Sequence, residues 1–215
     1  TSITKESPAL ESDWSVLDLS LQMGLRDFVH QSGAKKVIIG LSGGIDSACV
    51  AALATKALGA ENVLAVSLPT PLTSQLSRDL AKKQSELLGI QFKEIFLNDV
   101  LSAAGKSFDL KNDDGIPYEN LQSRLRGLAL MSESNKSGRL MLACGNKSEL
   151  ATGYGTLYGD IAGALAPIGD LLKTEVYGLC HFWNLQKPTI LKEIIERVPT
   201  AELAPNQKDV DSLPP

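Results

Sequence analysis

The sequence has few of the residues that mark disulfide-stabilised, membrane-spanning or nucleic-acid-binding proteins. Its three cysteines, Cys49, Cys144 and Cys180, lie far apart and form no C-x-x-C pair, so neither a disulfide framework nor a zinc knuckle is expected. No apolar run approaches the ~20 residues that span a bilayer, and residues 1–13 lack the layout of a secretory signal. Lys and Arg number 21 against 25 Asp and Glu, a balance that indicates neither a nucleic-acid nor an anionic membrane partner. We expect a cytoplasmic protein with neither partner.

Histidine is also scarce, which limits the chemistry that the chain can carry out by itself. His30 and His181 are the only two and are expected to be packing or surface residues, so neither a histidine-based triad nor a three-histidine metal site is expected. Apolar residues make up 43% and charged residues 21% of the 215 residues, which is ordinary globular usage. We therefore predict one large domain over residues 14–198. A disordered or linker segment over 1–13 precedes it, and a proline-rich mobile tail or lid over 199–215 follows.

The order of the predicted elements indicates an α/β fold. Short apolar, β-branched runs alternate with helical patterns, and the runs predict strands at 37–41, 63–68, 92–97 and 139–143. The helical patterns cover residues 14–28, 46–58, 77–88, 98–108, 118–134, 173–183 and 189–197. This alternation predicts a doubly wound parallel sheet of about five strands with helices on both faces. Ligands of such sheets bind just beyond the carboxyl ends of the strands.

One motif stands directly between the first predicted strand and the next helix, Ser42-Gly43-Gly44-Ile45-Asp46-Ser47. Two glycines permit a tight turn, so backbone NH groups of the turn and of the helix start can face phosphate oxygens. The motif is neither a Walker A loop nor a G-x-G-x-x-G fingerprint. The alternative is an ordinary turn in which Ser or Asp is the helix N-cap. Asp46 is then either a magnesium ligand or a charge that compensates the helix dipole.

Two more polar segments follow the fourth predicted strand and therefore belong to the same edge of the sheet. In Gly145-Asn146-Lys147-Ser148-Glu149, Asn146 and Glu149 have the spacing of a capping box, so a structural role competes with a functional one. Further on, four closely spaced glycines form a loop over residues 153–160. Its backbone can approach a ligand, although many glycine-rich loops bind nothing.

The S-G-G-I-D-S motif after a strand resembles the signature of the PP-loop ATP pyrophosphatases, which split ATP between the α and β phosphates. With E-N-L-Q-S-R, G-N-K-S-E, G-Y-G-T-L-Y-G-D, P-I-G-D-L-L-K-T and P-T-A-E-L-A-P in this order, the chain resembles the synthetase domain of NAD synthetase from about Gly24 to Pro215. The resemblance implies an adenine nucleotide alpha hydrolase-like fold. It also implies ATP-dependent amidation of nicotinic acid adenine dinucleotide (deamido-NAD) through an adenylated carboxylate. Ammonia is then the nitrogen donor, and AMP and pyrophosphate are products.

The resemblance also assigns roles to individual residues. It implies that the ATP phosphates contact Ser42, Gly43, Gly44, Ser47, Lys173 and Thr200. Asp46 and Glu149 are then the ligands of Mg²⁺, and Arg124 and Asp160 contact deamido-NAD. Asp160 also lies near the incoming ammonia, so the implied catalytic residues are Asp46, Lys173 and Asp160. Arg124 and Arg126 lie two apart on a predicted helix, so at most one of them reaches a given group.

Several questions stay open at this level. Cys144 stands where the family often has Thr, and the family normally continues beyond the final Leu-Pro-Pro, so the tail is expected to be truncated. Ammonia is either free or derived from glutamine, and no glutaminase domain is found in this chain. Members of the family are homodimers, so the resemblance implies a homodimer. The alternatives are another PP-loop enzyme, such as a GMP synthetase-type amidating enzyme, and a non-catalytic nucleotide-binding module.

Overall fold

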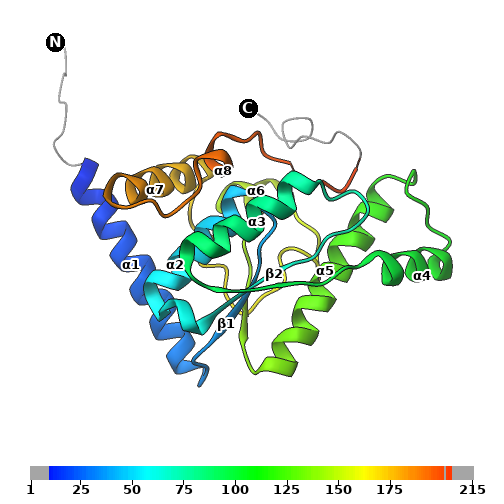
Figure 1. Cartoon of the computed structure of the whole chain (residues 1–215), viewed down its shortest axis with the longest axis horizontal. Coiled ribbons are helices and arrows are strands. Elements are labelled where there is room, and N and C mark those ends of the chain that lie inside the picture. Colours follow the sequence, from blue (N-terminus) through cyan, green and yellow to red (C-terminus); the bar gives the residue numbers. More distant parts are fainter. Residues whose placement is uncertain (1–9, 201, 205–215) are drawn as a thin grey trace, which may run out of the picture.

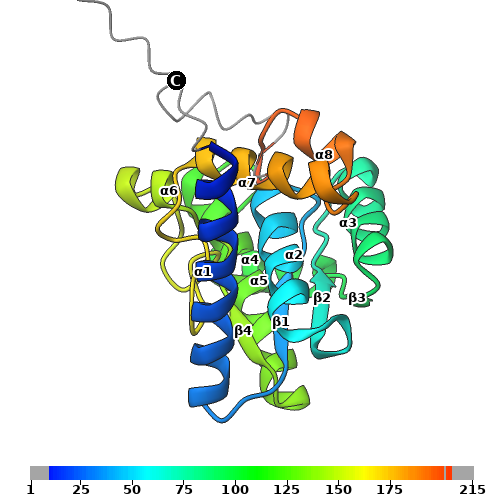
Figure 2. The ribbon, with the colours of Figure 1, turned by 90° about the vertical axis from the view of Figure 1, so that its left-hand side faces the viewer.

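Four parallel strands form the centre of the fold, and helices cover both faces of the sheet (Figure 1 and Figure 2). The computed structural model describes residues 10–200 and 202–204. Its strands are β1 (Val37–Gly40), β2 (Val63–Ser67), β3 (Gln91–Glu94) and β4 (Leu140–Leu142). They lie side by side in the order β3-β2-β1-β4, and every pair is parallel. The predicted α/β fold class is thereby confirmed.

The sheet differs from the prediction in the number of its strands. The sequence predicts about five, whereas the described residues form four, and the fifth place next to β4 holds a single isolated bridge between Leu142 and Leu165. Ala164 N donates to Met141 O at 2.8 Å, and Ala143 N donates to Leu165 O at 2.9 Å. The pairing stops there because the chain passes β4 only briefly before it turns into the next loop. This segment therefore borders β4 without becoming a strand.

The helices have the following bounds in the described part of the chain: α1 (Leu10–Gln31), α2 (Ile45–Leu58), α3 (Gln75–Leu88), α4 (Asn98–Phe108), α5 (Ile116–Ser137), α6 (Lys147–Thr152), α7 (Lys173–Gln186) and α8 (Lys192–Glu196). A short 3-10 turn, η1 (Ala60–Asn62), leads into β2. Helix α1 begins at Leu10, earlier than the predicted residue 14. No helix among the described residues is both long and apolar enough to cross a bilayer. Most of the predicted tail, residues 201 and 205–215, lies outside the described residues.

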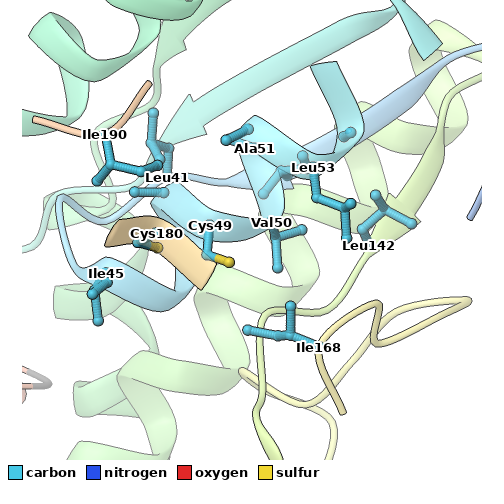
Figure 3. Close-up of a cluster of buried hydrophobic side chains, with 14 of the residues drawn as sticks. Leu41, Ile45, Cys49, Val50, Ala51, Leu53, Leu142, Ile168, Cys180 and Ile190 are labelled. Carbon is cyan, nitrogen blue, oxygen red and sulfur yellow. The ribbon is translucent and has the colours of Figure 1, made fainter. Parts of the chain in front are cut away.

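One face of the sheet carries the larger core. Helix α2 packs on β1 and β2 and is itself contacted by α1, α3, α7 and α8. The strand residues Val37 and Ile39 and the helix residue Val50 are completely buried in this core. Figure 3 shows Cys49 of α2 and Cys180 of α7 inside the same cluster. All three cysteines are free thiols, in agreement with the expected absence of a disulfide framework.

The opposite face is covered by α5, with α4 packed against α5 (Figure 1). Its apolar cluster is smaller and is built around Ile38, Val66, Leu130 and Met141. Alternate strand residues therefore serve the two faces, and both are apolar because helices cover both. Near the carboxyl ends of the strands, α5 presents polar side chains instead of apolar ones. The site described next lies at these strand ends.

Candidate active site

The strand order places a cavity at the carboxyl edge of the sheet. The chain leaves β1 toward β2 on one side, and β4 lies on the other side, so β1 and β4 flank the point where the strand order reverses. Open α/β sheets bind ligands at this point. A cavity of about 630 Å³ lies there. Its walls come from the loops after β1 and β4, from α5, from the glycine-rich loop (Gly153–Asp160), and from the C-terminal segment (residues 197–200 and 202–204).

The first wall is the serine-glycine loop (Ser42–Ser47), which connects β1 to α2. Gly43 has a φ of +85°, and a Cβ atom there would lie 2.5 Å from the carbonyl oxygen of Ser77. The loop therefore packs directly against the start of α3, and only glycine fits at this position. Helix α2 begins immediately after Gly44, so its first NH groups face the same cavity.

Hydrogen bonds within the serine-glycine loop fix its shape. Ser42 N donates to Ser47 Oγ at 3.2 Å, Gly44 N donates to Ser42 Oγ at 3.2 Å, and Ser47 Oγ donates to Gly44 O at 3.0 Å. The N-cap of α2 is Gly44, and no described side chain caps the helix. The interpretation in which Ser or Asp is the N-cap is therefore wrong. No described side chain accepts hydrogen bonds as a cap at the start of α2, so its first backbone NH groups can bind another acceptor, such as a phosphate.

Asp46, at the start of α2, contacts two residues that are distant in the sequence, and it lines the cavity. Its carboxylate accepts a hydrogen bond from Asn146 Nδ2 at 3.0 Å and forms an ion pair with Lys173 Nζ at the start of α7. Burial by itself lowers the pKa of Lys173, but Asp46 and, more weakly, Glu149 outweigh burial, so that the pKa is raised. Lys173 is therefore a cation at neutral pH, next to the serine-glycine loop.

Asn146 and Glu149 form the capping box that their spacing predicts. Glu149 N donates to Asn146 Oδ1 at 3.0 Å, and Asn146 N donates to Glu149 Oε2 at 3.1 Å. Asn146 is completely buried, so it fixes the start of α6 relative to Asp46. The two residues therefore have the structural role of capping α6. Glu149 also lines the cavity, so this role does not exclude a functional one.

The acidic side chains fit a magnesium ion that is held together with a phosphate. Asp46 and Glu149 line one cavity and are linked through Asn146, and carboxylate oxygens are the ligands that Mg²⁺ prefers. The described residues contain no group of three or more His, Cys, Asp or Glu that would hold a metal ion by itself. Mg²⁺ commonly uses one or two carboxylates and completes its shell with phosphates and water.

On the other side of the cavity, Asp160 ties the glycine-rich loop to α5. Its Oδ1 accepts hydrogen bonds from Ser123 Oγ at 2.6 Å and from Thr156 N at 2.9 Å. Asp160 N in turn donates to Ser123 Oγ at 3.0 Å. A Cβ atom at Gly159 would lie 2.4 Å from the same hydroxyl, so the loop and the helix touch through their backbones. Asp160 is therefore a cavity residue and also a fixed point of the loop.

The structure separates the two arginines of α5. Arg124 is exposed, its Nε donates to Leu157 O at 3.2 Å, and it does not line the cavity. Arg126 lines the cavity, and its Nε donates to Leu68 O at 3.2 Å in the loop after β2. Burial lowers the pKa of Arg126, opposed by Glu202 and Asp160. The sequence prediction named Arg124 alone, so Arg126 is a cavity residue that it missed.

Of the other predicted residues, Ser42, Gly44, Ser47 and Thr200 line the cavity together with Asp46, Glu149, Asp160 and Lys173, whereas Gly43 lies behind the loop against α3. The sequence prediction also missed Arg197 and Glu202 beside Thr200. Arg197 NH2 and Glu202 Oε1 form an ion pair at 2.7 Å. The available signal was the acid of P-T-A-E-L-A-P, which follows Thr200 by two positions.

A tight turn at a helix start, a neighbouring cation and two acids in one cavity are features typical of nucleotide sites in α/β proteins. Comparison with known proteins narrows the class, because the family model described as NAD synthase matches residues 19–215. The chain belongs to the NAD synthase family.

Two curated relatives and three solved structures illustrate the likeness. The chain is 50% identical over 198 residues to the glutamine-dependent NAD(+) synthetase of Xanthomonas campestris pv. campestris (strain 8004), covering 89% of this chain and 36% of the relative. The corresponding protein of Thermotoga maritima is 47% identical, with 91% and 35% covered. The chain thus spans about a third of the length of the curated relatives that it matches.

The solved structures include the glutamine-dependent NAD+ synthetase of Acinetobacter baumannii in complex with ADP. It has a TM-score of 0.84 at 39% identity, covering 94% of this chain and 39% of that one. The NMN synthetase of Francisella tularensis has a TM-score of 0.84 at 28% identity, covering 92% and 80%. The NH3-dependent NAD synthetase of Campylobacter jejuni has a TM-score of 0.75 at 36% identity, covering 82% and 76%.

Proposed function

We propose that this chain carries the ATP-dependent step that amidates deamido-NAD to NAD, releasing AMP and pyrophosphate. One observation carries the proposal: a single cavity collects the serine-glycine loop, Asp46, Glu149 and Lys173 at the switch point of the sheet. These groups are of the kinds that bind a triphosphate and stabilise a leaving pyrophosphate. Membership of the NAD synthase family supports the choice of substrate.

In the first step, the nicotinate carboxylate attacks the α-phosphorus of ATP. The bond between that phosphorus and the oxygen leading to the β-phosphate breaks, and pyrophosphate leaves. The serine-glycine loop and the first NH groups of α2 hold the phosphates, with Ser42 and Ser47 adding hydroxyl donors. Lys173 and Thr200 approach the same phosphates from α7 and from the C-terminal segment. No protein nucleophile is needed, because the site acts through positioning and charge.

Asp46 and Glu149 are the residues that would hold Mg²⁺ in this site. The ion, when bound, supplies positive charge that stabilises the leaving pyrophosphate. In the structure, Asp46 is neutralised by Lys173. We propose that Lys173 turns to the phosphates when ATP binds, which leaves the carboxylate of Asp46 for the ion.

In the second step, ammonia attacks the carbonyl carbon of the adenylated nicotinate. A C–N bond forms, the bond between that carbon and the phosphate oxygen breaks, AMP leaves, and the nitrogen releases one proton to solvent. We assign the incoming ammonia to the side of the cavity where Asp160 lies, because its carboxylate attracts ammonium and accepts hydrogen bonds. The ammonia is either free or supplied by glutamine hydrolysis in another part of a longer protein. The relatives named glutamine-dependent are almost three times as long as the matched region.

We further propose a homodimer that brings Arg124 to deamido-NAD. Arg124, Leu128 and Met131 follow one another at turn spacing on α5, and all three are exposed. Leu157 and Tyr158 of the glycine-rich loop add exposed apolar area, and Arg124 contacts this loop. An exposed apolar patch next to a cavity is typical of a subunit contact. Sedimentation velocity of the protein tests this proposal.

The remaining assignments rest on coarser support. We propose that residues 14–198 form the synthetase domain and that the described part of the predicted tail, residues 199–200 and 202–204, forms a lid over its cavity. The lid assignment is supported by the cavity contacts of Thr200 and Glu202. A cytoplasmic location is supported by three free thiols, since reducing compartments keep cysteines unpaired.

Product analysis tests the proposed reaction. The protein is incubated with ATP, Mg²⁺ and ammonium, alone and with one of three acceptors: deamido-NAD, nicotinic acid mononucleotide or xanthosine monophosphate. We expect AMP and NAD only with deamido-NAD. AMP only with the mononucleotide would place the chain with the NMN synthetase that it resembles. AMP only with xanthosine monophosphate would indicate a GMP synthetase-type enzyme, and bound ATP without AMP would indicate a non-catalytic module.

A further inference from the structure

The carboxylate of Glu202, in the C-terminal segment, accepts hydrogen bonds at the N-terminal end of α3. Glu202 Oε1 accepts hydrogen bonds from Ser74 Oγ at 2.7 Å and Ser77 Oγ at 2.8 Å, and Oε2 accepts one from Ser74 N at 3.2 Å. Helix α3 has no acidic residue in its own first turn. Glu202 therefore supplies the negative charge that a helix N-terminus favours, from 128 residues away along the chain.

Arg197 completes this group of contacts. Its NH2 donates to Glu202 Oε1 at 2.7 Å, and its NH1 donates to Ser77 Oγ at 2.7 Å. The side chains of Arg197 and Glu202 are only 19% and 16% exposed. Burial by itself raises the pKa of Glu202, but the bonds from Ser74, Ser77 and Arg197 outweigh it, so that the pKa is lowered. The pair is thus a charged, well-partnered contact at neutral pH.

The pair lies beside the serine-glycine loop. Ser77, which bonds both Arg197 and Glu202, is the residue whose carbonyl oxygen would lie 2.5 Å from a Cβ atom at Gly43. Arg197 also lines the same cavity as Asp46 and Lys173. The guanidinium of Arg197 therefore stands at the edge of the serine-glycine loop and lines the same cavity as Lys173.

We infer that Arg197 is a further binding residue for the ATP phosphates and that Glu202 is the positioning residue that holds its guanidinium ready. A guanidinium has five NH donors, and its bonds to Ser77 and Glu202 use two of them, which leaves donors for a phosphate. The carboxylate of Glu202 is already covered by Ser74, Ser77 and Arg197, so its charge is offset before an anion arrives. This inference rests on the proposed function, because it takes ATP as the ligand.

Kinetics with ATP as the varied substrate test the inference. Arg197→Met is expected to raise the KM for ATP about tenfold or more, as for the loss of a charge-assisted hydrogen bond, while the KM for deamido-NAD stays unchanged. Glu202→Gln keeps the shape of the side chain but places an NH2 group among the donors of Ser74, Ser77 and Arg197. We therefore expect a smaller rise in the KM for ATP, about fivefold. The double variant is expected to behave like Arg197→Met, since Glu202 acts through Arg197. An unchanged KM for ATP in Arg197→Met, or a double variant whose effect is the product of the two, would overturn the inference.

Limited trypsin digestion gives a readout that does not depend on activity. Trypsin cleaves after arginine, and Glu202→Gln is expected to speed cleavage between Arg197 and Val198 because it frees the guanidinium. The matched control is Lys192→Gln, which breaks an exposed ion pair with Glu196 in α8 and should change neither cleavage at Arg197 nor the KM for ATP. Cleavage that is equally slow in Glu202→Gln would show that Glu202 does not hold Arg197.

The two proposals fail in different ways. If the unaltered protein forms no AMP with deamido-NAD, the proposed function is wrong. Equilibrium dialysis of ATP and Mg²⁺ against the unaltered protein and the Arg197→Met variant then still decides the role of Arg197. Equal ATP affinity of the two proteins would remove Arg197 from the phosphate site, whereas weaker binding by the variant would support it.

Discussion

The serine-glycine loop and the glycine-rich loop line the same cavity, but they are held in different ways. The serine-glycine loop is fixed by its own hydrogen bonds and continues directly into the completely buried interior of α2. The glycine-rich loop has an exposed tip, with Tyr158 82% exposed, and is attached to α5 through Asp160. The first loop is therefore preorganised by its own hydrogen bonds and by the core, whereas the second depends on side-chain hydrogen bonds with α5 and on close backbone contact.

From this difference we infer which substrate binds next to each of the two loops. A rigid turn with NH groups and a nearby cation suits a charged group of fixed shape, such as a triphosphate. A loop with exposed side chains, fixed at one end, suits a larger substrate whose contacts are completed by another surface. The three changes that follow are aimed at one side or the other, from the largest expected effect to the smallest.

The largest effect is expected from Asp46→Asn on the phosphate side. The neutral amide is a poor magnesium ligand and loses the ion pair with Lys173, so we expect AMP formation to fall by about 100-fold or more. The matched control is Asp99→Asn, since Asp99 is also an acid in the first turn of a helix but is exposed. If Asp46 only compensated the helix dipole, the two variants would lose little activity and about equally.

An intermediate effect is expected from Gly43→Ala. The residue would be strained at a φ of +85°, and its Cβ would lie 2.5 Å from the Ser77 carbonyl oxygen. We expect the free energy of unfolding to fall by about 2 kcal/mol and the KM for ATP to rise about tenfold. Gly44→Ala is the control for stability, because Gly44 has a φ of −91° and its Cβ would meet only Ser42 Oγ, at 3.4 Å. Equal losses of stability in the two variants, measured by urea unfolding, would contradict this account of the loop.

The smallest effect is expected on the other side of the cavity, from Gly127→Ala in α5. Its Cβ would lie 3.0 Å from the carbonyl oxygens of both Tyr158 and Gly159, so the glycine-rich loop must shift. We expect the KM for deamido-NAD to rise about fivefold while the KM for ATP stays unchanged. The control Gly24→Ala, in α1, has nothing within 4 Å of its Cβ and should stabilise the protein by about 0.5–1 kcal/mol. A rise in the KM for ATP instead would show that the two sides of the cavity are not separable.

The sequence predicted the elements around the first loop well, because local signals coincide there. The run Val37-Ile38-Ile39 is fully buried as expected, and Gly43 lies where the strand turns into α2. Helix α4 was predicted with its observed bounds, Asn98–Phe108. Strong periodicity and glycine at the boundaries made these predictions possible.

Other features depend on contacts between distant residues and leave no local pattern. The place of β4 beside β1, the single bridge that replaces a fifth strand, and the exposure of Arg124 are set by how elements pack. The group formed by Arg197, Glu202 and α3 joins residues more than a hundred positions apart. Spacing along the chain does not reveal such partners. The resemblance to a family named Asp46 and Lys173 as separate site residues, and their ion pair became visible only in the structure.

The hydrogen bond between Asn146 and Asp46 closes a loop of 100 residues, and the ion pair of Asp46 with Lys173 closes one of 127. Contacts that close such long loops form late during folding, because the chain loses conformational entropy before these contacts stabilise it. We therefore expect Asp46 to reach Asn146 and Lys173 only after β1, α2 and β2 have packed together. Conversely, detachment of the edge strand β4 from β1 would separate Asn146 from Asp46 while most of the larger core remained intact.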